Sequence, residues 1–160
     1  MMTRLLWIVL RFSLCAWIGA ATLFVVTGIR EVTSDLFEPV MKNQLAELRF
    51  PSYYLFGFTL VGAGTLAAGL LSMRRQASQK RLRIVLTICL ATLAIMLIDY
   101  LWIYSPLAAL MSEPNARSMP EFEAYHTWSK WINVASLSAC LLAAVISLVD
   151  CNNSTEKHND

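Results

Sequence analysis

Four long apolar runs alternate with shorter polar segments along this chain. The runs cover residues 5–29, 52–73, 84–105 and 128–149, and each is close to the roughly 20 residues that a helix needs to cross a hydrocarbon core. The pattern predicts an all-α integral membrane protein with four transmembrane helices in a bundle, forming one domain over residues 1–150. Residues 151–160 are polar and are predicted to be a disordered tail.

The segment between the first two runs, residues 30–50, has a different pattern. Phe37, Met41, Leu45 and Leu48 recur at helical spacing among charged residues. This spacing is typical of an amphipathic helix that lies at the membrane surface or caps the bundle. We predict such a helix in the first outer loop, ended by Pro51.

Tyr53 and Tyr54 follow at the start of the second run. Tyrosine is enriched where a transmembrane helix meets the interface between membrane and water. We therefore predict that both side chains belong to an interfacial aromatic belt.

Charge sets the expected orientation in the membrane. Residues 74–83 contain five basic residues and no acidic one, which predicts a cytoplasmic loop under the positive-inside rule. Residues 30–50 and 105–125 carry more acid than base, as expected for the opposite side. We predict a multi-pass protein of the cell or inner membrane with both termini in the cytoplasm.

Composition narrows the functional classes. Hydrophobic residues make up 57% of the chain and charged residues only 15%, so the lipid bilayer is the expected partner. The net charge of +2 gives no reason to expect nucleic acid. The four cysteines lack metal-ligand spacing, and no nucleophile elbow or phosphate loop is present. We expect no enzyme, metal or cofactor, and leave open a homo-oligomer or a membrane-protein partner.

Asp99 is the acidic residue that lies well inside a predicted span. A carboxylate at membrane depth is costly unless it is paired, protonated or hydrated, so it is a candidate functional residue. Asp99 lies about six residues, or roughly 9 Å, from the outer end of its span at 1.5 Å per residue. Counted from Trp128, Asn133 reaches a similar depth in the fourth span.

A second group of polar residues lies at the start of the fourth span. His126, Ser129, Lys130 and Asn133 follow one another at i, i+3, i+4 and i+7, so their side chains share one helical face. The candidate site is an outer-leaflet polar cluster of Asp99, His126, Ser129, Lys130 and Asn133. Lys130 or Arg30 is available as its counter-charge.

Three groups of residues carry a resemblance to a known family. They are Trp17, Gly19, Phe24, Val25 and Gly28; Phe50, Pro51 and Tyr53; and Phe122, Tyr125, His126, Ser129 and Asn133. With these residues the chain resembles the transmembrane protein 205-like family, whose domain is of unknown function. The resemblance implies a small four-helix membrane protein, and eukaryotic members are associated with drug resistance and the secretory pathway.

The chain departs from the family pattern near the candidate site. Asp99 stands where the family tends to have an asparagine, Pro106 lies one place late, and Thr127-Trp128 replaces Gly-Leu. The resemblance carries over no catalytic residue.

Three functional hypotheses follow. In the first, the polar cluster handles an ion or a small molecule or supports stress resistance, and a proton-linked version couples Asp99 to the charging of His126. In the second, the protein is a structural or assembly subunit and the cluster fixes helix register. In the third, it is a redox protein holding haem or quinone, which the lack of a second intramembrane histidine disfavours.

Overall fold

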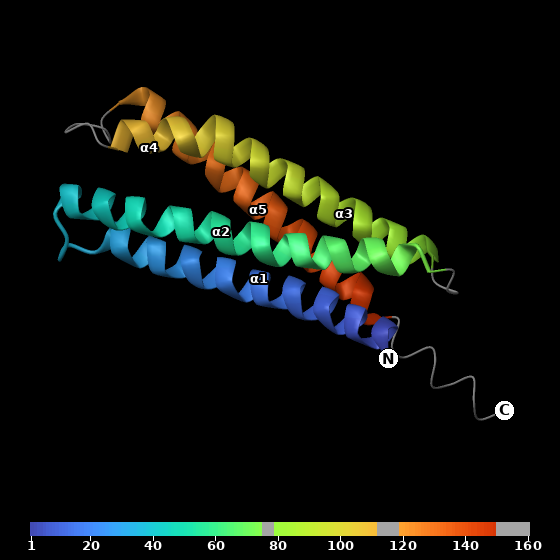
Figure 1. Cartoon of the computed structure of the whole chain (residues 1–160). Helices are drawn as coiled ribbons and strands as arrows, with labels where there is room; N and C mark the ends of the chain where they lie inside the picture. Colours follow the sequence, from blue (N-terminus) through green and yellow to red (C-terminus); the bar gives the residue numbers. More distant parts are fainter. Residues whose placement is uncertain (75–78, 112–118, 150–160) are drawn as a thin grey trace.

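The computed structural model describes residues 1–74, 79–111 and 119–149, and these ranges are helical apart from short turns (Figure 1). The elements are α1 (Met2–Thr33), α2 (Pro39–Ser72), α3 (Gln79–Ile98), the π-helix η1 (Asp99–Tyr104), α4 (Ser105–Met111) and α5 (Pro120–Val149). The predicted tail at 151–160 lies outside the described residues.

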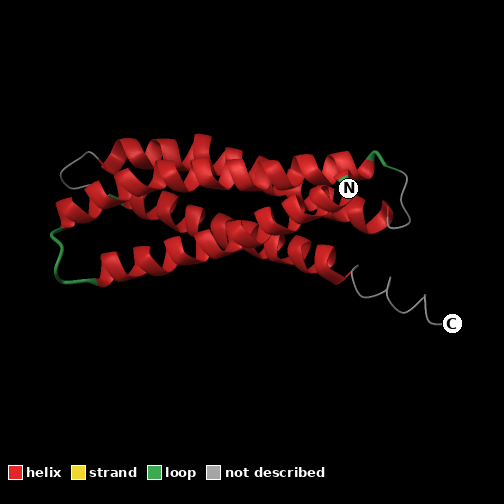
Figure 2. Ribbon diagram, turned by 60° about the horizontal axis from the view of Figure 1, so that its bottom comes forward, coloured by secondary structure: helices red, strands yellow, loops and turns green. Residues whose placement is uncertain are grey.

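Four helical stretches within the described residues are long and apolar enough to cross a membrane. They are α1, α2, the continuous stretch Gln79–Met111 and α5, with 32, 34, 33 and 30 residues. The predicted all-α, four-helix membrane bundle is confirmed (Figure 2). At 1.5 Å per residue these stretches are about 45–51 Å long, so they extend beyond a hydrocarbon core of about 30 Å.

The amphipathic segment at 30–50 differs from the prediction in one respect. It is not a separate helix, because α2 begins at Pro39 and continues through Pro51 into the second span. A proline inside a helix removes one backbone hydrogen bond. Aromatic packing on both sides of Pro51 supports the continuous helix: the Phe24 ring centroid of α1 lies 5.3 Å from that of Phe50 and 4.3 Å from that of Tyr53.

Close packing of the first three helices depends on Gly57. A Cβ atom at this position would lie 2.5 Å from Met96 Cε and 2.6 Å from the Trp17 ring. No side chain larger than hydrogen fits there without moving its neighbours. Gly64 lies about two helical turns farther along α2. A Cβ atom there would make an ordinary contact, 3.6 Å from Ser13 Cβ.

An arginine joins the first and last helices. Arg11 donates hydrogen bonds from Nε and Nη2 to the Ser147 carbonyl at 3.0 and 2.7 Å. Ser147 lies in the last turn of α5, where backbone carbonyls lack partners within the helix. Arg11 therefore caps α5 from α1.

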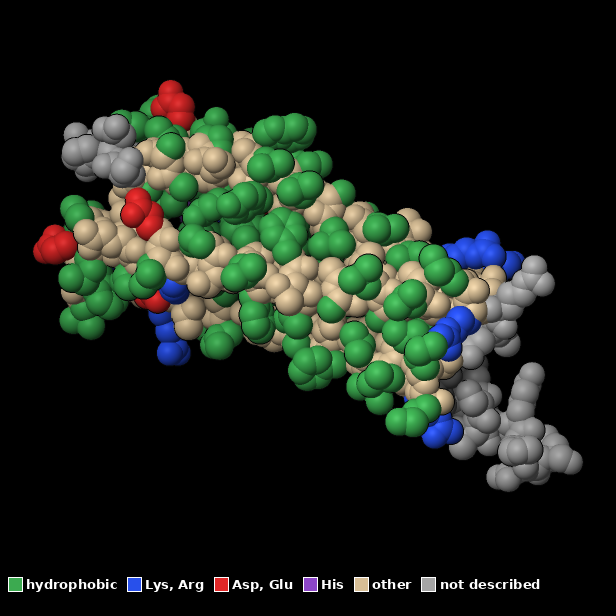
Figure 3. All heavy atoms as spheres, in the orientation of Figure 1, with side chains coloured by type: hydrophobic (Ala, Val, Ile, Leu, Met, Phe, Trp, Pro, Cys, Tyr) green, Lys and Arg blue, Asp and Glu red, His purple; other side chains and the backbone are tan. Residues whose placement is uncertain are grey.

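The two ends of the bundle differ in charge. The acidic end carries more acidic than basic side chains. The acidic ones are Glu31, Asp35, Glu38, Glu47, Glu121 and Glu123, and the basic ones include Arg30, Lys42 and Arg49. The basic end carries Arg4, Arg74, Lys80, Arg81 and Arg83. In the space-filling view, acidic side chains lie at the left, most basic ones at the right, and hydrophobic side chains cover the length between (Figure 3). This exposed apolar surface is what a membrane protein presents to lipid.

Candidate functional site

Asp99 is buried at the junction between α3 and η1, with 1% of its surface exposed. In the π-helix the backbone hydrogen bonds reach one residue farther than in an α-helix: the Ser105 N–H donates to the Tyr100 carbonyl, five residues earlier. Pro106 follows directly and has no N–H to donate. The π-helical turn therefore lies directly before a proline, and such turns often occur at functional sites.

Two hydroxyl groups contact the Asp99 carboxylate. The Tyr54 hydroxyl donates to Asp99 Oδ2 at 2.6 Å, a length typical of a hydroxyl bound to a carboxylate. The Ser129 hydroxyl lies 3.5 Å from the same oxygen. The other oxygen, Oδ1, is buried and has no hydrogen-bond partner within the described part of the chain.

Asn133 extends this group of hydrogen bonds toward α2. The Tyr53 hydroxyl donates to Asn133 Oδ1 at 2.7 Å. Asn133 Nδ2 donates to the Ser129 carbonyl at 2.8 Å and to the Ser129 hydroxyl at 3.2 Å. The polar cluster in the structure therefore consists of Tyr53, Tyr54, Asp99, Ser129 and Asn133, and it joins α2, η1 and α5.

Aromatic rings surround the polar cluster. The Tyr54 ring centroid lies 5.1 Å from that of Tyr100 and 5.0 Å from that of Tyr104. On the other side, the Tyr53 ring centroid lies 5.0 Å from that of Trp17. These apolar walls make an unpaired charge inside the cluster costly.

The structure brings together three of the predicted site residues: Asp99, Ser129 and Asn133. His126 and Lys130 are exposed on α5, and the His126 ring stacks on Phe122 with centroids 6.1 Å apart. Arg30 is exposed on α1. The predicted roles of His126 and Lys130 in the site, and of Lys130 or Arg30 as counter-charge, stay predictions.

The two tyrosines are the site residues that the sequence patterns did not identify. We predicted that both belong to an interfacial belt, but their side chains point into the bundle, with 9% and 2% of Tyr53 and Tyr54 exposed. Counting residues did not mark them, because they lie only one and two residues inside the predicted start of the second span, about 1.5–3 Å deep, whereas Asp99 was estimated at roughly 9 Å.

The donor set is one carboxylate surrounded by hydroxyl and amide groups. Within residues 1–74, 79–111 and 119–149, no three histidine, cysteine, aspartate or glutamate side chains gather to hold a metal ion. The cluster can accept a proton at Asp99 Oδ1.

Comparisons with protein-family models, with curated proteins and with solved structures give no match.

Proposed function

We propose that this integral membrane protein handles an ion or small molecule near the outer face of the membrane, with Asp99 as a reversible proton-binding group. One observation carries the proposal. Asp99 is 1% exposed, it makes no ion pair with a described residue, and its Oδ1 has no hydrogen-bond partner among them.

The free energy of burying the carboxylate supports proton binding. An ionised carboxylate at membrane depth without a counter-charge costs several kcal/mol, and two neutral hydroxyl donors offset only part of this cost. The other titratable side chains of the polar cluster are Tyr53 and Tyr54 from α2, and their hydroxyl groups supply no positive charge. A proton on Oδ1 would remove the cost of the buried charge.

The location of the site rests on the distribution of charge. Arg74, Lys80, Arg81 and Arg83 at the basic end favour a cytoplasmic position for that end and for both termini. The polar cluster then lies in the outer leaflet. The proposal includes no catalytic step.

Membership of the transmembrane protein 205-like family is part of the same proposal. Residues from its separate sequence motifs meet in the structure: Tyr53 contacts Trp17 and Phe24 through its ring and Asn133 through its hydroxyl. These contacts support a common role for the motif residues, which is to form one site.

The proposal can be tested in liposomes that contain the purified protein and a trapped pH-sensitive dye. We expect the wild-type protein to speed the collapse of an imposed pH gradient and Asp99→Asn to abolish that acceleration. Asp35→Asn is the matched control, because Asp35 is exposed at the acidic end. Equal rates for wild type and Asp99→Asn would contradict the proposal.

A structural role is the second candidate, and a specific observation favours it. The hydrogen bonds Tyr53 to Asn133 and Tyr54 to Asp99 tie α2 to α5 and η1, and such bonds fix helix register in membranes. This role predicts that Asp99→Asn, which preserves one hydrogen-bond acceptor, leaves both the fold and the rate of gradient collapse unchanged.

A further inference from the structure

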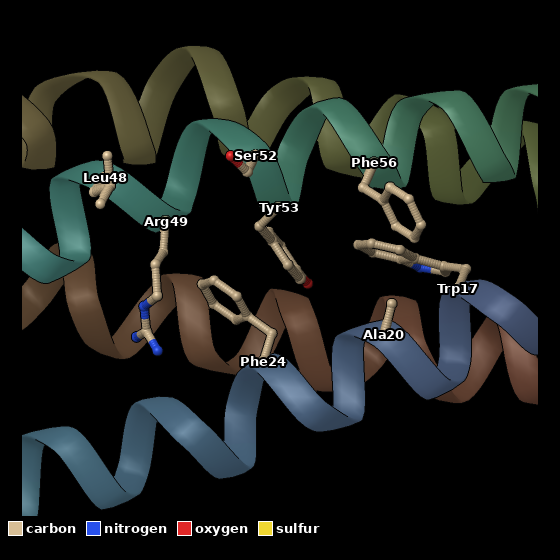
Figure 4. Close-up of a pocket in the computed structure, with 8 residues that line it drawn as sticks. All are labelled: Trp17, Ala20, Phe24, Leu48, Arg49, Ser52, Tyr53 and Phe56. Carbon is tan, nitrogen blue, oxygen red and sulfur yellow. The ribbon is translucent and has the colours of Figure 1, made fainter.

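A groove of about 420 Å³ runs along the surface between α1 and α2. It is lined by Trp17, Ala20, Phe24, Leu48, Arg49, Ser52, Tyr53 and Phe56. In the close-up view, Phe24 and Trp17 from α1 and Arg49, Tyr53 and Phe56 from α2 point into the space between the two helices (Figure 4).

The groove crosses the level where lipid headgroups meet acyl chains. Counted from Arg4 at the basic end, Phe24 of α1 lies about 30 Å along the helix at 1.5 Å per residue. Counted from Arg74, Tyr53 of α2 reaches a similar height, at about 31 Å. With a hydrocarbon core of about 30 Å, Arg49 lies at headgroup level and Trp17 lies among acyl chains.

At the headgroup end, Arg49 lines the groove and Glu31 lies beside it as its ion-pair partner. Arg49 Nη1 lies 2.7 Å from Glu31 Oε1, and the two side chains are 25% and 26% exposed. Arg49 Nε is buried and has no hydrogen-bond partner among the described residues. The guanidinium lies over the Phe24 ring, 5.1 Å from its centroid, so the cation is held at the top of the apolar wall.

The remainder of the groove is apolar. The rings of Trp17, Phe24, Tyr53 and Phe56 form most of its walls, and Ala20 leaves space between them. A flexible hydrocarbon chain suits such a wall. A soluble peptide does not, because this part of the surface lies at acyl-chain depth.

We infer that the groove binds a zwitterionic phospholipid of the outer leaflet. Its phosphate would contact Arg49, its ammonium group would contact Glu31, and one acyl chain would follow the rings toward Trp17. Charge complementarity selects this occupant, since the Arg49–Glu31 pair matches a headgroup with both charges, whereas an anionic lipid would meet repulsion from Glu31. The inference takes its leaflet from the orientation in the proposed function, but it does not depend on proton binding at Asp99.

Native mass spectrometry of the detergent-purified chain tests this lipid assignment. The probes are phosphatidylethanolamine and phosphatidylglycerol, supplied in equal amounts. We expect wild type to retain one phosphatidylethanolamine in preference, and Arg49→Gln and Ala20→Phe each to lower its retention at least five-fold. Ala20→Phe fills the groove but leaves the ion pair in place. This variant therefore still tests the inference if Arg49→Gln impairs folding.

The matched controls lie outside the groove. Arg30→Gln removes an exposed charge at the same end, and Ala94→Phe adds a ring to an exposed position of α3; both should keep wild-type retention. Glycerophosphoethanolamine, which lacks acyl chains, should not displace the lipid. Equal retention by all variants, meaning an unselective lipid annulus, would overturn the inference, and so would preference for phosphatidylglycerol or displacement by the chain-free headgroup.

Discussion

Buried hydroxyl groups in the two halves of the bundle have different hydrogen-bond partners. Toward the basic end, Thr65 and Ser147 donate to carbonyls of their own helices, Val61 at 2.7 Å and Ala144 at 2.7 Å. Toward the acidic end, Tyr54 and Tyr53 donate to side chains of other helices, Asp99 at 2.6 Å and Asn133 at 2.7 Å.

This difference distinguishes polar groups that are satisfied within their own helix from polar groups that need partners on other helices. A hydroxyl bonded to a carbonyl of its own helix needs no neighbour, so its position says little about function. A carboxylate that depends on donors from two other helices and keeps one unpaired oxygen is costly for the fold. The candidate site is therefore assigned to the acidic half.

The largest expected effect is at Gly57, where α1, α2 and α3 meet. Gly57→Val should lower the free energy of unfolding in detergent by about 3 kcal/mol, because its side chain overlaps Trp17 and Met96. Gly62→Val is the control, since a Cβ there meets nothing within 4 Å. Chemical denaturation of both variants provides the measurement. Similar stabilities would show that the close packing at Gly57 is not needed.

A smaller effect is expected for the site's main hydrogen bond. Tyr54→Phe removes the donor at 2.6 Å from Asp99 Oδ2 and should cost about 2 kcal/mol of stability, since a buried acceptor loses its partner. Denaturation should be followed together with the pH-gradient assay. A loss below about 0.5 kcal/mol would mean that water or another group replaces the tyrosine.

The smallest effect is expected in the basic half. Thr65→Val removes a hydroxyl that bonds within its own helix, so stability should change by no more than about 0.5 kcal/mol. The same denaturation protocol applies. If Thr65→Val cost as much as Tyr54→Phe, the distinction between the two halves would be lost.

Hydropathy was sufficient to predict the four helices because each long apolar run must cross the bilayer. Counting residues from the ends of the spans also placed Asp99 and Asn133 at one depth, and both belong to the polar cluster in the structure. Depth can be counted from the sequence because each residue of a helix adds a fixed rise along the helix axis.

Rotation of each helix about its axis was harder to predict. The spans are apolar on most sides, so periodicity does not show which face turns inward. For this reason no sequence pattern shows that Tyr53 and Tyr54 are buried. On α5, Ser129 points inward, and the flanking positions of Lys130 and His126, about 100° and 60° away around the helix, are exposed.

Two backbone features also lay beyond the sequence pattern. Proline usually predicts the end of a helix, yet α2 continues through Pro51. The π-helix at Asp99–Tyr104 turns the side chains that follow it. Both depend on packing with neighbouring helices, which local sequence does not specify.

Infrared spectroscopy of the chain in lipid tests proton binding at Asp99 most directly. A protonated carboxyl group has a C=O stretching band that an ionised one lacks. The other acidic side chains give bands of their own at low pH, so the Asp99 band is the one that is missing from the spectrum of Asp99→Asn. Titration of pH should make this Asp99 band appear and disappear reversibly in wild type and in Asp35→Asn. A wild-type spectrum without the band at any pH at which the protein is folded, or an unchanged band in Asp99→Asn, would contradict the assignment of Asp99 as the proton-binding group.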